Sequence, residues 1–135
     1  MLPFGVSLVG VVMAAVVTFL IGMIWYSPIL FAKPWVALNG YTPDKLAERK
    51  RAAPRAYGVS FVAYLVLGIG VGALVRGGPV LDGVWAGILI WAFLITPVGV
   101  TALVFSEKRL GAWLIDAGYQ LVYLAAMGAI LSRWG

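Results

Sequence analysis

The residues best suited to chemistry share one face of the last apolar segment of the sequence. Asp116 is followed by Gln120 and Tyr123 at spacings of four and seven, which place the three side chains on one side of a helix, with Tyr119 beside them. If this segment crosses a membrane, a carboxylate in it costs at least ~2.5 kcal/mol unless it is partnered or hydrated. Asp116 therefore marks either a binding site or a hydrogen-bonded anchor.

Polar residues of the other apolar segments fall at a similar depth, roughly 6–14 Å from one membrane face. Together with Asp116 they can form one buried polar layer. Pro97 adds to this layer because it kinks its segment and leaves the carbonyl oxygen of Phe93 without a helical donor. Tyr64 or a water molecule can supply that donor. The other members of the layer are Thr18, Tyr64, Thr96 and Thr101.

Three interpretations of Asp116 stay open from the sequence. It can bind a proton, an ion or a small ligand. It can accept hydrogen bonds from tyrosine and threonine hydroxyl groups in a network that fixes the register of the helices. It can also extend toward the membrane surface and pair with Lys108 or Arg109.

The composition indicates what surrounds these residues. Of the 135 residues, 63% are hydrophobic and 11% are charged, and the mean hydropathy is +1.01. Because an average soluble domain has about 25% charged residues, this chain is an integral membrane protein. It contains no cysteine and no histidine, which removes disulfides and the usual ligands of zinc and haem. We therefore expect no metal and no cofactor and, despite a net charge of +5, no nucleic-acid partner.

Four apolar runs are long enough to cross the ~30 Å hydrocarbon core of a membrane. They cover about residues 3–26, 56–74, 81–105 and 110–132. The sequence thus predicts an all-α integral membrane fold, a single four-helix transmembrane bundle over residues 1–135. The link 27–55 contains the helix-start signal Thr42-Pro43-Asp44, which predicts a short charged helix over about 43–53 that Pro54 ends.

The basic residues are divided unevenly between the two sides of such a bundle. The positive-inside rule places the first and third connections, which carry most of them, in the cytoplasm and both chain ends outside. The segment 45–55 is then a surface for anionic lipid. The connections carry Lys33, Lys45, Arg49, Lys50, Arg51, Arg55, Lys108 and Arg109, and the other side carries Arg76 and Arg133.

Two further patterns concern position and packing. Aromatic residues after the first span suit the membrane interface, where rings lie at the level of the lipid headgroups. Glycines in the second and third spans permit close contact between helices, and with the small interior of the bundle they also predict a homo-oligomer. The interface residues are Trp25, Tyr26, Ser27, Pro28 and Trp35, and the packing glycines are Gly68, Gly72, Gly83 and Gly87.

Several stretches resemble the four-span bacterial membrane family known as domain of unknown function 1761. The most specific is Trp25-Tyr26-Ser27-Pro28 with Leu30-Phe31 and Trp35. The resemblance implies a four-helix topology and a place in the bacterial cytoplasmic (inner) membrane, and it implies no reaction. The other matching stretches are Asn39-Gly40-Tyr41-Thr42-Pro43-Asp44, Ala56-Tyr57 with Ser60-Phe61-Val62, and Leu114-Ile115-Asp116-Ala117-Gly118-Tyr119.

The sequence leaves two functions in view. The first is a transporter or channel protomer with a buried polar site around Asp116. The alternative is a non-catalytic membrane scaffold or accessory subunit that docks through its basic cytoplasmic link. An enzyme is not expected, because the interiors of the spans offer one acid and no base to hold an anionic cofactor.

Overall fold

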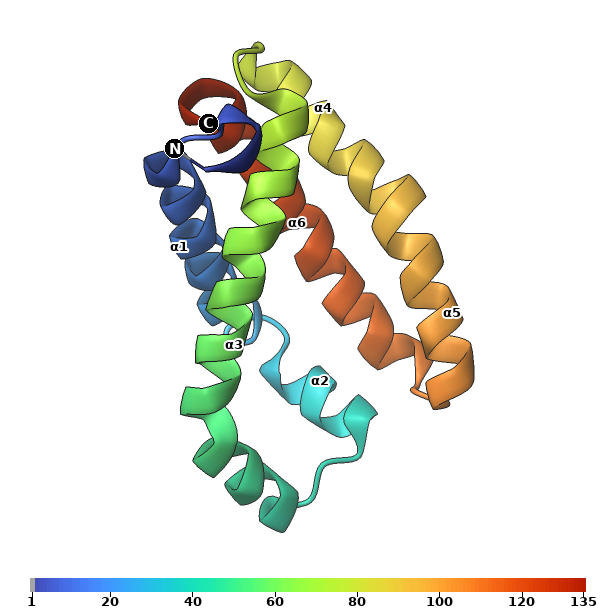
Figure 1. Ribbon diagram of the computed structural model, residues 1–135. Coiled ribbons are helices and arrows are strands. Elements are labelled where there is room, and N and C mark those ends of the chain that lie inside the picture. The colour runs from blue at the N-terminus through green and yellow to red at the C-terminus, as the bar shows by residue number, and fades with distance from the viewer. Residues whose placement is uncertain (1) are drawn as a thin grey trace.

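The computed structural model describes residues 2–135 and builds them almost entirely from helices (Figure 1). Four helical runs are long and apolar enough to cross a membrane, namely α1, α3, the continuous run from α4 to α5, and α6. The predicted all-α membrane fold is confirmed. In chain order the elements are η1 (Pro3–Gly5), α1 (Leu8–Trp25), α2 (Ala32–Asn39), α3 (Pro43–Val75), α4 (Val80–Ile90), the π-helical turn η2 (Trp91–Ile95), α5 (Thr96–Ser106) and α6 (Leu110–Trp134).

Helix α1 begins later than the apolar run does. The Ser7 hydroxyl accepts a hydrogen bond from the Gly10 N–H at 3.4 Å and caps the helix, so the residues before it form the separate turn η1. Helix α3 begins where the sequence predicts a helix start. The Thr42 hydroxyl accepts from the Lys45 N–H at 3.2 Å, with Pro43 in the first helical position.

The prediction that Pro54 ends a short charged helix is wrong. Helix α3 runs without interruption from Pro43 to Val75, so the charged segment and the second span are one helix of about 50 Å. Proline removes a donor for the carbonyl oxygen of Lys50, but the residues around this turn are exposed, and solvent can replace the missing hydrogen bond. The neighbouring alanines also have high helix propensity.

The link between α1 and α3 contains a helix that the sequence analysis did not predict. Residues Ala32–Asn39 form α2, which ends at Gly40 with φ 69°. This left-handed conformation favours glycine and allows the chain to turn sharply into the start of α3. This part of the link is therefore a short helix that packs against α6.

The third span is interrupted in the middle. Between α4 and α5 the backbone widens into the π turn η2, where the Thr96 N–H donates to the Trp91 carbonyl oxygen. Pro97 follows directly and cannot donate to the Phe93 carbonyl oxygen. A widened turn next to a proline is a common way for a helix to accommodate the missing hydrogen bond.

The core is densest at the end of the bundle where the chain ends lie (Figure 1). There α4 and α6 approach so closely that a Cβ atom at Gly83 would overlap the carbonyl oxygen of Gly128. Gly87 lies in the same way against Leu124 of α6, Gly68 lies against Val11, and Gly72 lies against Val6 and Leu131. All four predicted packing glycines thus lie at contacts inside the protomer.

The opposite end of the bundle is more open (Figure 1). Helices α3 and α5 diverge toward it, and α2 lies between α3 and the beginning of α6. Neither η2 nor α5 has a buried residue, whereas α6 is buried along much of its length. This difference between the two ends determines where a site can form.

Candidate functional site

Asp116 is the centre of a polar cluster at the open end. Its Oδ1 accepts hydrogen bonds from the Tyr26 hydroxyl at 2.6 Å and from the Trp35 indole N–H at 3.0 Å. Its Oδ2 pairs with the Lys108 ammonium at 2.6 Å. The Asp116 side chain is 24% exposed and that of Lys108 is 35% exposed, so the pair lies at the edge of the bundle. We call these four residues the Asp116 cluster.

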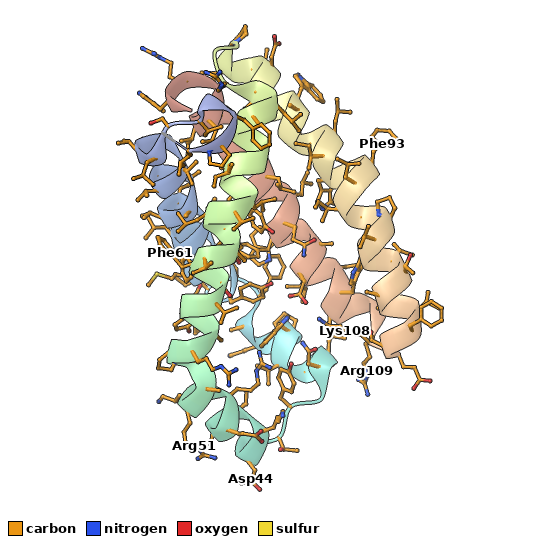
Figure 2. All side chains as sticks on the ribbon, in the orientation of Figure 1. Asp44, Arg51, Phe61, Phe93, Lys108 and Arg109 are labelled. Carbon is orange, nitrogen blue, oxygen red and sulfur yellow. The ribbon has the colours of Figure 1, made fainter. Side chains whose placement is uncertain are left out.

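Lys108 reaches Asp116 from the short connection between α5 and α6. Glu107 adopts a left-handed conformation at the end of α5, and α6 begins after Arg109. Lys108 therefore lies just outside the helix, where its long side chain can turn back over the first turns of α6 (Figure 2). This is one of the pairings that the sequence left open, and two donors that it did not indicate complete the cluster.

Those two donors come from the Trp25-Tyr26-Ser27-Pro28 turn and from α2. Tyr26 caps the end of α1, and the Phe31 N–H donates to the Trp25 carbonyl oxygen at 3.1 Å, which closes the turn. The Trp25 indole N–H donates to the Ile115 carbonyl oxygen at 3.0 Å. Instead of only marking the membrane surface, these aromatic residues dock α1 and α2 against α6.

A second network lies deeper, between α1, α3 and α6. The Tyr119 hydroxyl donates to the Thr18 carbonyl oxygen at 2.8 Å and lies 3.3 Å from the Tyr64 hydroxyl. The Thr18 hydroxyl donates within its own helix to Ala14 at 2.8 Å. The Tyr123 ring packs on those of Tyr64 and Tyr119, with centroids 5.4 and 4.8 Å apart. Four of the predicted polar residues thus come together.

The third span does not join either network, so the expected single polar layer from all four helices is wrong. Thr101 is exposed and donates to the Pro97 carbonyl oxygen of its own helix at 3.0 Å. Within residues 2–135, the Thr96 hydroxyl is buried without a partner, and Gln120 makes no side-chain hydrogen bond. Tyr64, a candidate donor for the Phe93 carbonyl oxygen, bonds to Tyr119 instead.

The reason is the angular position of these residues on α6. The face of α6 that contacts the third span carries Ala117 and Leu124, since the Trp91 indole N–H donates to the Ala117 carbonyl oxygen at 2.9 Å and Gly87 lies against Leu124. Asp116 precedes Ala117 by one residue and points about 100° away from it. Its side chain therefore faces α1 and α2.

A pocket of about 890 Å³ opens between α1, α2 and α3 on the same side as the Asp116 cluster. Two residues belong to both features, because Tyr26 and Trp35 line the pocket and also donate to Asp116. The pocket therefore has walls that the partly buried carboxylate of Asp116 holds in position. Its aromatic lining consists of Phe19, Tyr26, Trp35, Tyr57, Tyr64 and Tyr119.

The mouth of the pocket is basic. Arg49 and Lys50, on the charged part of α3, line it. The Arg49 guanidinium lies 5.3 Å from the Trp35 ring centroid and 4.8 Å from that of Tyr41, within the range of a cation–π contact. The salt bridges of residues 2–135 involve neither of these two basic side chains. The pocket thus combines a cationic rim with an aromatic wall.

Four apolar helices joined by polar connections define a multi-pass helical membrane protein. The chain belongs to the DUF1761 family, described as a protein of unknown function, whose model matches residues 9–132. The matched range covers the four spans except for Leu8 and the last two residues of α6, includes the Asp116 cluster and the pocket, and confirms the resemblance noted from the sequence. Neither a search of curated proteins nor a search of solved structures found a match.

Proposed function

We propose that the protein is a non-catalytic membrane protein that binds an amphipathic molecule in the pocket between α1, α2 and α3. The observation that carries this proposal is the pocket itself, a volume of about 890 Å³ with aromatic walls and a basic mouth. Ligand sites of small molecules typically measure about 300–1,000 Å³ and combine apolar walls with a few placed polar groups. A molecule with an apolar tail and a polar head fits this combination.

In this proposal Asp116 positions the pocket and does not carry a proton or an ion. Its carboxylate is occupied by the Tyr26 hydroxyl, the Trp35 indole and the Lys108 ammonium. A transported cation has to displace these partners, whereas a positioning role uses them as they stand. The geometry therefore supports a binding protein over the transporter or channel protomer that the isolated charge of Asp116 suggested.

Blocking the pocket tests the proposal. Ser60 lines the pocket and Gly58, two residues earlier, has open space around its Cβ position. We expect Ser60→Trp to reduce crosslinking of a photoactivatable fatty-acid probe in lipid nanodiscs by roughly tenfold, because the indole fills the space that the probe occupies. Gly58→Trp serves as the matched control and leaves crosslinking unchanged. Equal crosslinking of both variants and the wild type argues against a ligand in this pocket.

The alternative function, a scaffold or accessory subunit, is supported by the exposed charged part of α3. Lys45, Arg49, Lys50, Arg51 and Arg55 all lie there, and each is exposed. If the protein docks a partner through its whole basic surface, replacing Arg51 and Arg55 weakens binding of the partner as much as replacing Arg49 and Lys50. If the pocket binds the ligand, only the replacement of Arg49 and Lys50 weakens binding.

We also propose the orientation and assembly that the sequence indicates. In this proposal both chain ends lie outside a bacterial cytoplasmic membrane. Cysteines introduced at Lys50 and Arg109 are then protected from a membrane-impermeant thiol reagent in intact cells, while a cysteine introduced at Gly78 reacts. Labelling of the cysteine at position 50 would show the opposite orientation.

Gly83 and Gly87 already contact α6 within the protomer, so they do not support a homo-oligomer. The proposal of a homo-oligomer is supported instead by the exposed apolar face of α5. The mass of the protein in nanodiscs tests this assembly. A monomer contradicts it.

A further inference from the structure

We infer that the ligand of this pocket is a phospholipid of the surrounding leaflet, with its anionic phosphate headgroup held by Arg49 and Lys50 and its acyl chain along the aromatic wall. This inference rests on the proposed binding function and adds the chemical class of the ligand. Three features of the pocket lead to it, namely the charge at the mouth, the way Arg49 is held, and the length of the wall.

The charge at the mouth is not neutralised by the protein. Arg49 and Lys50 are consecutive and both line the pocket. Glu48, the acid next to them in sequence, lies 3.6 Å from Lys45 and forms an ion pair with that residue. Within residues 2–135 the salt bridges leave both Arg49 and Lys50 without an acidic partner. Two adjacent cations at the mouth of an aromatic cavity favour an anion there.

Arg49 is held in a position suited to a phosphate. Its guanidinium packs on the rings of Trp35 and Tyr41, with distances of 5.3 and 4.8 Å to the two centroids. Because aromatic rings hold the guanidinium and no salt bridge among residues 2–135 involves it, its N–H groups are available to an anion. These N–H groups form the planar fork that binds phosphate through two parallel hydrogen bonds, and Lys50 adds a point charge beside it.

The wall of the pocket is long enough for an acyl chain. The lining residues on α3 extend from Arg49 to Tyr64, which corresponds to about 22 Å of helix. Along this length Phe19 of α1 packs on Tyr57 and Tyr64, with ring centroids 6.2 and 5.5 Å apart, and Met23 is exposed beside it. The wall thus leads from the charged segment into the apolar part of the bundle. A soluble anion uses only the mouth, whereas a phospholipid uses both parts.

Lipid retention measured by native mass spectrometry tests the inference. The protein is released from nanodiscs that contain equal amounts of phosphatidylglycerol, which is anionic, and phosphatidylcholine, which has no net charge. We expect the wild type to retain phosphatidylglycerol at least about tenfold more than phosphatidylcholine. The double variant Arg49→Gln and Lys50→Gln loses this preference. The control variant Arg51→Gln with Arg55→Gln removes the same charge from the same helix but outside the pocket, and we expect it to keep the preference for phosphatidylglycerol.

The outcomes separate this inference from the proposed function. If the wild type retains both lipids equally, the inference that the ligand has an anionic headgroup is wrong. In that case, loss of both lipids in Ser60→Trp still supports the proposed function, a ligand in the pocket. Equal loss of preference in both double variants overturns the specific role of Arg49 and Lys50 in favour of general attraction to the basic surface. Titration with inorganic phosphate in a neutral detergent distinguishes the source. Binding of free phosphate as tight as that of phosphatidylglycerol overturns a membrane lipid as the ligand.

Discussion

Where the chain ends lie, α4 and α6 meet through the backbone atoms of glycines, whereas at the other end α2 is held to α6 by side chains, with Leu38 packed on Gly111. Gly83 and Gly128 bring the first pair of helices together. Tyr26, Trp35 and Lys108 hold the second end through one carboxylate, that of Asp116. The first arrangement leaves no room for a side chain between α4 and α6 at Gly83, and the second leaves the aromatic pocket beside the contact.

The comparison shows how a four-helix chain this small can form a cavity. Contacts between small residues pack the helices closely at one end, where the Gly77 N–H also donates to the Ser132 carbonyl oxygen at 3.0 Å. That fixed end allows the helices to diverge toward the other, where a few long aromatic side chains span the increased distance. The stability and the binding site of the bundle therefore depend on different residues, and substitutions can separate them.

The largest effect is expected at the glycine contact. A Cβ atom at Gly128 would overlap the Gly83 carbonyl oxygen, and neither backbone can move without separating α4 from α6. Gly128→Ala should lower the free energy of unfolding by about 3 kcal/mol or more. Chemical unfolding in mixed micelles measures this value. Gly70→Ala, where nothing lies within 4 Å of the Cβ position, should leave stability within about 0.5 kcal/mol of the wild type. Equal stability of the two variants contradicts the close crossing.

The next largest effect is expected at Asp116. Asp116→Leu leaves the Tyr26 hydroxyl, the Trp35 indole and the Lys108 ammonium without their acceptor, which should cost about 1–3 kcal/mol. Asp116→Asn retains a carbonyl oxygen for Tyr26 and Trp35 and should cost less. The same unfolding experiment compares the two variants. If the leucine variant is as stable as the wild type, the cluster does not hold this end together.

A smaller effect is expected when one donor is removed. Tyr26→Phe keeps the ring, its packing on Trp35 at 5.4 Å and the lining of the pocket, but it removes the hydrogen bond to Asp116. We expect a loss of about 1 kcal/mol. Tyr57→Phe is the matched control, because Tyr57 also lines the pocket, is 62% exposed and has no side-chain hydrogen bond among residues 2–135. An equal loss in both variants shows that the hydroxyl of Tyr26 contributes nothing through Asp116.

The smallest effect is expected at Lys108. Its side chain and that of Asp116 are partly exposed, and the free energy of such an ion pair is about 0–1 kcal/mol and falls as the salt concentration rises. Lys108→Gln should therefore lower thermal stability slightly at low salt and not at high salt. Arg109→Gln, which changes the same charge beside it, should show no such dependence. A larger loss for Arg109→Gln indicates that general charge, not the pair, stabilises this connection.

The sequence predicts the four spans well because each needs only a long apolar run and the charges that flank it. It predicts the start of α3 from Thr42 and Pro43, but not the continuation of that helix through Pro54, because the cost of a proline depends on whether solvent reaches the carbonyl oxygen that loses its donor. The sequence does not indicate α2, because a helix of eight residues with Lys33 and Pro34 in its first turn has no strong periodic pattern.

The site was only partly predictable for a similar reason. Tyr64 and Thr18 follow from their depth in the spans and Tyr119 from its place beside Asp116 on the helix, but depth does not give the angular position that separates Asp116 from Thr96 and Thr101. Lys108 is one of the partners that the sequence offers for Asp116, whereas Tyr26 and Trp35 belong to stretches that were identified for another reason. The family resemblance is carried by Trp25–Pro28 with Trp35 and by Leu114–Tyr119, and the structure brings these two stretches into contact. Their joint presence was the signal for the cluster.

The length of α3 has a mechanical consequence. A helix of about 50 Å is a lever, so rotation by about 5° around its Val75 end displaces its charged end by about 4 Å. Membrane-spanning helices change their tilt when the hydrocarbon layer becomes thinner or thicker. Since Arg49 and Lys50 are on the charged arm of this lever, we expect a change in the tilt of α3 to move the basic mouth of the pocket relative to α1.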